Sequence, residues 1–389
     1  MTSEVDRVRS CCVVTCFSLD QPGFLDFAYR IRALATRYRV TVIGAHGPNV
    51  PELQIDGVTH VALADGDEAC SVRRYLWRVA LYLRKARPDF VILLHTLAAP
   101  LVHALRATPC ALYWNEHAIR FKASSPCSPI KRILRELKYE WSFISAMRKA
   151  DLVMPIGEAH RDDLLAHGCR PERVKMIYMG VDKVFSGVAL QRIGPDDDGP
   201  LDVVYTGSVN KDRGRDVMLE AVAKARSLGV PVRLVIVGAL ESERQICQVY
   251  ARELDIETNV VVHGRLPGSE IPRFIASADA GICIWEDRPW TRFNPPTKLF
   301  EYLVAGLPVL ASNIKTHTDY VSHGMNGLIF DYDGDSLAGA FGELWRRRKD
   351  LSAMRRRAWE SGRRYLWSTI EPVFLEAVAS MVRGKAAKR

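Results

Sequence analysis

Residues 204–214 read Val-Tyr-Thr-Gly-Ser-Val-Asn-Lys-Asp-Arg-Gly, and this stretch decides the fold of the second half of the chain. Its apolar start is typical of a buried strand, its middle is a loop bounded by Gly207 and Gly214, and residues 215–225 have a helical pattern. A strand that turns into a helix in this way points backbone N–H groups and the positive end of the helix dipole at one place. We therefore predict an anion site, with Arg213 as a candidate ligand for phosphate oxygens.

A second motif, at residues 294–309, reads Asn-Pro-Pro-Thr-Lys-Leu-Phe-Glu-Tyr-Leu-Val-Ala-Gly-Leu-Pro-Val. Its two prolines favour the start of a helix whose first-turn amides face a ligand, and Gly306 favours its end. Lys298 and Glu301 are three residues apart and so share one helical face. A carboxylate at this place suits the hydroxyl pair of a ribose, but the residues alone leave open an ordinary surface ion pair.

Strand-like apolar runs alternate with amphipathic segments in both halves of the chain, which is the pattern of an α/β protein. The runs lie at 12–16, 40–43, 90–94, 110–114, 152–155, 174–177, 203–205, 234–237, 260–262, 280–283 and 308–310. Residues 187–200 are rich in Gly, Asp and Pro and are typical of a linker. We predict two doubly wound, Rossmann-like domains, at 1–190 and 200–368, and a final helix at 369–389 that returns to the first domain.

The chain carries 54 Lys and Arg against 45 Asp and Glu, a net charge of +9 that favours anionic partners. No recognition module or concentrated basic and aromatic stripe indicates nucleic acid, so we expect none. The nine cysteines are odd in number and scattered, which fits a reducing cytoplasm. We see no signal peptide, no apolar run long enough to span a membrane and no metal-ligand spacing, and we expect no metal.

The loop at 207–214 has neither the glycine spacing of a dinucleotide fingerprint nor the Gly-Lys-Ser/Thr of a P-loop. The two motifs, with Ile-Tyr-Met-Gly-Val-Asp at 177–182, make nearly the whole chain resemble the family 4 glycosyltransferases, which have GT-B architecture, with two Rossmann-like domains facing across a cleft. The resemblance implies that Arg213 binds the diphosphate of a nucleotide-sugar donor and that Glu301 binds its ribose. The remaining donor-site residues that it implies are Gly207, Ser208, Gly214, Thr297 and Lys298.

The chain departs from the family pattern at two positions. Ser208 stands where many members have Arg, and Phe293 stands where they have a first Glu. Lys298 and the backbone near Thr297 are expected to replace these groups in part. The resemblance also implies a base-binding role for Arg265 and Leu266, and a phosphate or acceptor role for Gly23 in the loop after the first strand.

His117 follows the apolar run at 110–114, at the strand end where open α/β sheets place ligands. A lone histidine there is more often structural, but the resemblance puts a histidine at this position near the donor sugar. We therefore take His117 as the candidate catalytic residue, with Glu116 as its orienting partner, and rank His95 second.

The resemblance implies that the protein transfers a hexosyl or N-acetylhexosaminyl group from a UDP- or GDP-linked donor to a glycan, lipid-linked or small-molecule acceptor. It also implies retention of configuration and no cofactor or metal. The alternatives are a sugar-nucleotide 2-epimerase of the same architecture and a non-catalytic nucleotide-sugar-binding module.

Residues 128–149 have a basic, amphipathic helical pattern. Its apolar positions are Ile130, Ile133, Leu134, Leu137, Trp141 and Ile144. We expect this stripe to pack on its own domain, and peripheral contact with an anionic membrane is the alternative. The expected location is the cytoplasm, or the cytoplasmic face of the membrane.

Overall fold

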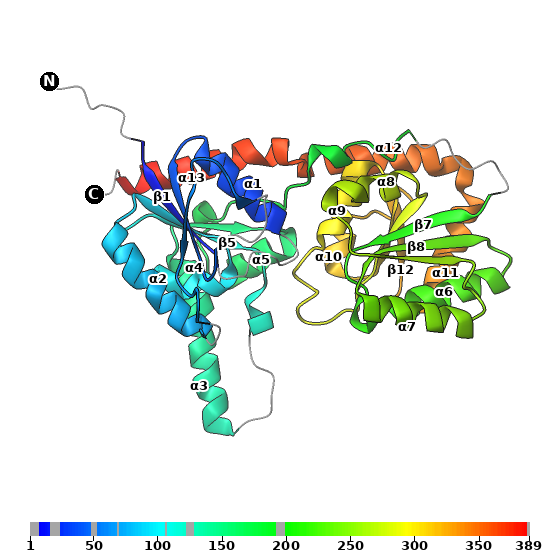
Figure 1. Cartoon of the computed structure of the whole chain (residues 1–389), viewed down its shortest axis with the longest axis horizontal. Coiled ribbons are helices and arrows are strands. Elements are labelled where there is room, and N and C mark those ends of the chain that lie inside the picture. The colour runs from blue at the N-terminus through cyan, green and yellow to red at the C-terminus, as the bar shows by residue number, and fades with distance from the viewer. Residues whose placement is uncertain are drawn as a thin grey trace. The chain divides into compact units, whose positions relative to one another are not determined.

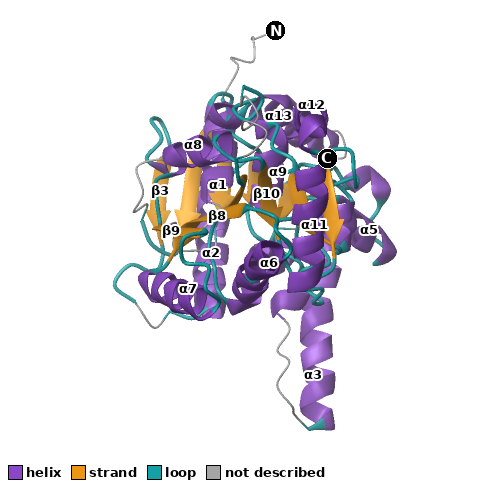
Figure 2. Ribbon diagram, turned by 90° about the vertical axis from the view of Figure 1, so that its right-hand side faces the viewer, coloured by secondary structure: helices purple, strands orange, loops and turns teal. Residues whose placement is uncertain are grey.

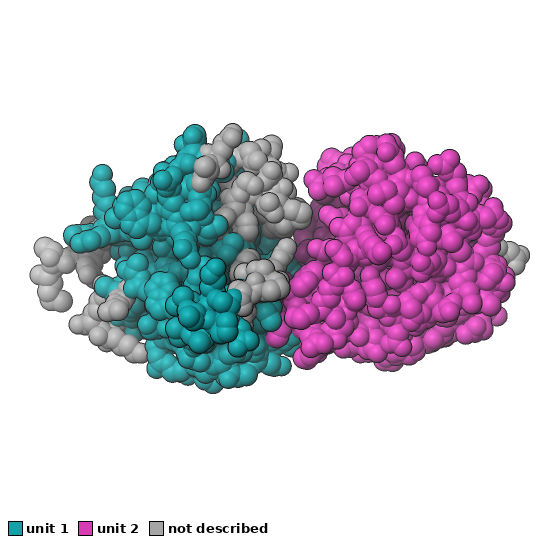
Figure 3. All heavy atoms as spheres, turned by 90° about the horizontal axis from the view of Figure 1, so that it is seen from below, with its two compact units in different colours: residues 1–180, 370–389 teal, residues 181–369 magenta. Residues whose placement is uncertain are grey.

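The structure is a computed structural model that describes residues 8–15, 24–47, 53–67, 70–105, 107–121, 128–191 and 199–386. The chain divides into two compact units, which Figure 3 colours separately. Unit 1 consists of Met1–Gly180 and Ile370–Arg389, and unit 2 is Val181–Thr369. Each unit contains a six-stranded parallel sheet, which confirms the predicted pair of doubly wound domains.

The sheet of unit 1 has the order β3-β2-β1-β4-β5-β6. Its strands are β1 (Ser10–Val14), β2 (Arg39–Gly44), β3 (Thr59–Ala62), β4 (Phe90–Leu93), β5 (Cys110–Trp114) and β6 (Leu152–Pro155). The helices around it are α1 (Phe24–Ala35), α2 (Val72–Ala86), α3 (Pro129–Tyr139), α4 (Ser145–Lys149), α5 (Glu158–Ala166) and α13 (Trp367–Ala386), and the 3₁₀ segment η2 covers Thr96–Ala104 (Figure 1). β1, β4, β5 and β6 are almost wholly buried because helices cover both faces of the sheet.

Helix α2 shows how the sequence builds this unit. The Ser71 side chain accepts a hydrogen bond from the Arg74 N–H and begins the helix. Tyr75, Val79 and Leu83, spaced four residues apart, are its buried positions. They share one apolar core with side chains of the segment 143–147, so these two parts of the chain cover the same face of the sheet.

The sheet of unit 2 has the order β12-β11-β10-β7-β8-β9. Its strands are β7 (Leu201–Thr206), β8 (Val232–Ala239), β9 (Val260–Gly264), β10 (Ala280–Cys283), β11 (Val309–Ser312) and β12 (Gly327–Phe330). Its helices are α6 (Arg215–Ser227), α7 (Glu241–Glu253), α8 (Ile271–Ala276), α9 (Thr297–Ala305), α10 (Lys315–Thr318), α11 (Gly334–Arg346) and α12 (Leu351–Gly362), on both faces of the orange sheet in Figure 2. The chain adds β8 and β9 on one side of β7 and then crosses over to add β10 on its other side. Open α/β sheets bind ligands at such a switch point, here between β7 and β10.

A buried ion pair holds the base of this sheet. Arg355 on α12 contacts Asp279 at 2.8 Å, and both side chains are at most 2% exposed. Asp279 also accepts a hydrogen bond from the Asp202 N–H at 3.0 Å. The pair therefore joins α12 to the start of β10 and, through Asp202, to β7.

The structure differs from the sequence-based expectation in three strands. Residues 174–177 were expected to form a strand but make only one bridge, between Val174 and Val153. The Lys175 and Ile177 N–H groups donate to Val153 O and Pro155 O, but Pro155 has no N–H group to donate in return and complete a ladder. The strands β3 and β12 were not predicted.

The first unit ends at Gly180, whereas the composition of the linker suggested residue 190. Residues after it belong to unit 2, because the Gly187 N–H donates to Val304 O and the Ala189 N–H donates to Ala305 O. Helix α13 begins at Trp367, and its residues from Ile370 onward belong to unit 1.

A buried cluster in unit 1 contacts the chain just before unit 2 begins and just after it ends. The Arg30 guanidinium lies 4.1 Å from the Tyr113 ring centre and 5.8 Å from that of Phe374 on α13. Arg30 also donates to Tyr178 O at 3.0 Å, and Asp26, its ion-pair partner, accepts from the Gly180 N–H at 3.2 Å. The chain is thus anchored both where it leaves unit 1 and where it returns.

Candidate functional site

The loop after β7 has the backbone that its glycines allow. Gly207 has φ +106° and Gly214 has φ +75°, a region that other residues rarely adopt. A Cβ on Gly214 would lie 2.7 Å from the Ile284 side chain, and one on Gly207 would lie 3.4 Å from Lys298 Nζ. Lys298 Nζ therefore lies directly beside the backbone of this loop.

Lys298 lies at the start of α9 and reaches the end of β7. Its Nζ is 3.3 Å from the centre of the Tyr205 ring, and the Tyr205 hydroxyl donates to Ser208 O at 2.8 Å. The pKa of Lys298 is lowered from 10.5 to about 7, mainly by burial; the positive charge of Arg213 contributes to this fall, and Cys283 and Glu301 oppose it. Two cationic side chains thus lie close enough to repel each other.

Arg213 lies beside two indole rings, which also contact each other at 5.7 Å between ring centres. Its guanidinium carbon is 5.1 Å from the ring centre of Trp285 and 5.7 Å from that of Trp290. Within the described ranges no carboxylate forms an ion pair with Arg213, and the neighbouring Asp212 pairs instead with Arg288 at 3.0 Å. The positive charge of Arg213 therefore has a fixed position, and no described carboxylate neutralises it.

Glu301 lies one turn further along α9. Burial raises the pKa of Glu301 from 4.5 to about 7, while the charge of Lys298 acts against that rise. Across the part of the chain that the structure describes, its carboxylate makes no hydrogen bond or ion pair, so the expected alternative of an ion pair with Lys298 is not formed. Pro296 precedes the helix without a side-chain cap, and its carbonyl accepts from the Leu299 N–H at 3.1 Å in the first turn.

Rigid contacts beneath the site hold these groups. The Tyr302 hydroxyl accepts from the Thr206 N–H at 2.9 Å and so ties α9 to the end of β7. The Ser312 hydroxyl accepts from the Trp285 N–H at 3.0 Å and donates to Trp285 O at 2.8 Å. The indole that faces Arg213 is thereby fixed to β11.

The structure brings together some of the predicted donor-site residues but not all. Gly207, Arg213, Lys298 and Glu301 gather at the carboxyl ends of β7 and β10. Arg265 and Leu266 follow β9, two strands from β7 at the same edge of the sheet, and no hydrogen bond or ring contact described for them joins this group. Gly23 lies outside the described residues.

His117 belongs to unit 1, just beyond the end of β5. Its Nε2 lies 3.0 Å from Asp163 Oδ2, and its Nδ1 accepts from the Ile119 N–H at 3.3 Å. This pattern puts the proton on Nε2, where it is donated to Asp163. The carboxylate that contacts His117 is on α5, and sequence reasoning did not select it.

Glu116 and His95, the other two candidates in unit 1, lie at the same edge of the sheet as His117. The Glu116 carbonyl accepts from the Thr96 hydroxyl at 2.7 Å, and the Thr96 N–H donates to Asn115 Oδ1 at 3.3 Å. His95 is buried, and its Nδ1 accepts from the Leu97 N–H at 3.1 Å, which caps η2. This contact gives His95 a structural role.

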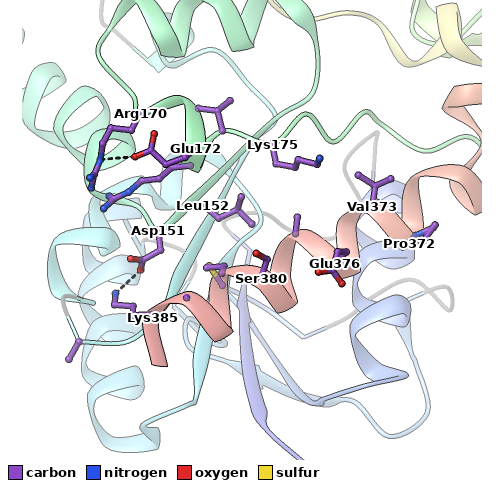
Figure 4. A pocket seen from close by; sticks show the side chains of 16 residues that line it. Asp151, Leu152, Arg170, Glu172, Lys175, Pro372, Val373, Glu376, Ser380 and Lys385 are labelled. Carbon is purple, nitrogen blue, oxygen red and sulfur yellow. Dashed lines mark hydrogen bonds and ion pairs between the residues drawn. The ribbon is translucent and has the colours of Figure 1, made fainter. Parts of the chain in front are cut away.

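A separate hollow of about 940 Å³ lies in unit 1 between α13 and residues 170–175 (Figure 4). It lies near the amino ends of β5 and β6, where Lys385 contacts Asp151 at 2.6 Å. It contains no predicted site residue. Its lining mixes acidic and basic side chains, including Arg170 and Glu172.

The fold and the two motifs define a protein of GT-B type. Residues 28–184 match the family described as Glycosyltransferase Family 4, and residues 200–347 match the family described as Glycosyl transferases group 1. The chain belongs to family 4 of the glycosyltransferases.

Individual proteins show a similar relationship. A Salmonella typhimurium protein assigned as the colanic acid biosynthesis glycosyltransferase WcaL is 25% identical over 54% of this chain and 51% of its own. The amylovoran biosynthesis glycosyltransferase AmsK of Erwinia amylovora is 24% identical over 54% of this chain and 50% of its own. The chain thus spans about half the length of these curated relatives. Anabaena HepE, in complex with UDP and glucose, shares the fold with TM-score 0.71 and 17% identity, over 96% of this chain and 100% of HepE.

Proposed function

We propose that the protein is a glycosyltransferase that takes a sugar from a nucleotide diphosphate donor bound in unit 2. The observation that carries this proposal is the placement of two basic side chains at the strand switch point, Arg213 against the Trp285 ring and Lys298 Nζ over the Tyr205 ring, where their like charges repel each other. A diphosphate placed beside them removes this repulsion. The Glu301 carboxylate, which bonds to no other group among the described residues, accepts hydrogen bonds from the ribose hydroxyls.

These groups also suit the chemistry of transfer. As the acceptor oxygen bonds to the anomeric carbon, the bond from that carbon to the phosphate oxygen breaks, negative charge grows on the leaving diphosphate, and the departing phosphate oxygen takes the proton of the acceptor hydroxyl. Arg213 and Lys298 stabilise that charge, together with the positive end of the α9 helix dipole. We propose that transfer proceeds with retention and without a metal, and that His117, held by Asp163, contributes to turnover.

For the donor we favour a UDP- or GDP-linked hexose or N-acetylhexosamine, and UDP is the first choice because the similar HepE is known in complex with UDP and glucose. For the acceptor we favour a glycan or lipid-linked sugar, because WcaL and AmsK are named for polysaccharide biosynthesis. We place the protein in the cytoplasm. No helix in the described part of the chain has the length and apolar character to cross a bilayer.

The test is to incubate the purified protein with a panel of UDP- and GDP-sugars, with and without glycan and lipid-linked acceptors. Mass spectrometry of the acceptor and chromatography of the nucleotide detect a new glycoside and released nucleoside diphosphate. A transferase forms both. An isomerised sugar without acceptor product indicates an epimerase, and donor binding without any turnover indicates a binding module.

A further inference from the structure

Helix α3 leaves an apolar stripe uncovered in unit 1. Figures 1 and 2 show the helix projecting away from the unit, and none of its residues is buried. The stripe consists of Ile130, Ile133, Leu134 and Leu137 on α3 and Trp141 in the turn after it, which are between 53% and 72% exposed. The expectation that it packs on the domain is therefore wrong, and only Ile144, beyond the helix, joins the core.

The base of α3 is firmly attached. The Trp141 ring stacks on His103 at 4.4 Å between ring centres, and His103 Nε2 lies 2.9 Å from Trp141 O. Phe143 and Ile144, which follow, are buried in the unit 1 core. The core thus holds the end of the helix and leaves the stripe outside it.

Helix α2 adds a second uncovered surface of the same kind. Trp77 and Leu81 lie four residues apart on its outer side and are 62% and 47% exposed. Because α2 and the segment 143–147 share one core over the same face of the sheet, these side chains and the base of α3 belong to the same side of unit 1. We call the exposed residues of α2 and α3 together the α2–α3 surface.

The charged residues of this surface are mostly basic. Helix α2 carries five basic and no acidic residues, and α3 carries four basic residues and one acidic residue. Arg74 and Arg78 pair with Asp67, but Arg73, Arg84 and Lys85 form no ion pair with any described acidic group. Long basic side chains beside exposed Trp, Leu and Ile are the composition of a helix that lies in the interface of an anionic bilayer.

We propose that the α2–α3 surface binds unit 1 to an anionic lipid membrane, with the α3 stripe inserted among the lipid headgroups and acyl chains. A second copy of the chain is a poorer occupant, because a symmetric dimer through this surface places basic residues against basic residues. The proposal does not depend on the enzymatic activity. It places the protein where a lipid-linked acceptor is found.

The test is flotation of the purified full chain with vesicles of phosphatidylcholine alone or mixed with phosphatidylglycerol. The wild-type chain is expected to float with the mixed vesicles, and less so as salt is raised. The double variant Leu134→Glu with Leu137→Glu is expected to lose roughly tenfold or more of its vesicle affinity, because two charges then replace inserted apolar side chains. Its melting temperature should stay unchanged, since both positions are exposed.

The matched control is Ile246→Glu with Val249→Glu on α7 of unit 2, at positions that are 43% and 46% exposed. This variant should float like the wild type. A wild-type chain that stays with neither vesicle, or a Leu134→Glu/Leu137→Glu variant that floats unchanged, overturns the proposal. So does a wild-type dimer in sedimentation that the same variant converts to monomers, because a second copy then covers the stripe.

Discussion

The pKa of Lys298 yields the sharpest prediction for the donor site. In the free protein that pKa is about 7, because the side chain is removed from water and lies near Arg213. A nucleoside diphosphate binds best when this ammonium is charged, so deprotonation competes with binding. If only the protonated form binds, the dissociation constant doubles at about pH 7 and rises roughly elevenfold at about pH 8 relative to acid conditions. UDP affinity should therefore fall by about tenfold between pH 6 and pH 8.

The assay is titration calorimetry with UDP and with GDP across this pH range, and the control is Lys298→Arg. An arginine stays charged throughout, so the ratio of wild-type to variant dissociation constants cancels the ionisation of the nucleotide. It also largely cancels the titration of Glu301, whose pKa is likewise about 7. A ratio that changes by less than about twofold between the two pH values would refute the assignment of Lys298 as a diphosphate ligand.

Three further predictions concern other residues. Replacing Arg213 by Ala should weaken UDP or GDP binding about 10- to 100-fold in calorimetry through loss of charge-assisted hydrogen bonds, and Arg213→Lys should restore part of it; unchanged affinity in both contradicts the site. Because Asp163 holds the His117 imidazole at 3.0 Å, His117→Ala and Asp163→Asn should both reduce turnover while nucleotide affinity stays unchanged, as kinetics and calorimetry on the same preparations will show. Asp279→Ala should lower the free energy of unfolding by about 3–5 kcal/mol in urea titrations, since it leaves the Arg355 charge buried without its carboxylate.

The fold was largely predictable because a parallel sheet buried on both faces leaves long apolar runs in the sequence. The runs at 110–114, 152–155 and 280–283 coincide with β5, β6 and β10. β3 was missed because it is an edge strand without a fully buried residue, so its residues Thr59–Ala62 mix polar and apolar types. Residues 174–177 were wrongly predicted to be a strand, because apolar composition does not reveal whether the neighbouring strand β6 can complete a ladder of hydrogen bonds with them.

The donor site was partly predictable, since Arg213, Lys298 and Glu301 lie in two contiguous motifs. Trp285 and Trp290 were missed, although two tryptophans in the ten residues before the second motif are a signal that could have been weighed. Asp163 could not have been found by spacing, because it is 46 residues from His117 and only the fold brings them together. The uncovered α3 stripe was also beyond the sequence, because periodicity shows that a helix has an apolar face but not what covers it.

The Arg30 cluster has a consequence for the order in which the protein is made. Unit 2 is one uninterrupted stretch, but unit 1 needs residues from Ile370 onward, whose Phe374 packs near the Arg30 guanidinium. During synthesis, which proceeds from the amino end, the second unit therefore has its whole sequence before the first one does. Until α13 has been synthesised, the N-terminal part of unit 1 lacks Phe374, which is fully buried in the complete unit. We expect a chain that ends just before Ile370 to leave this part of the unit 1 core exposed to water.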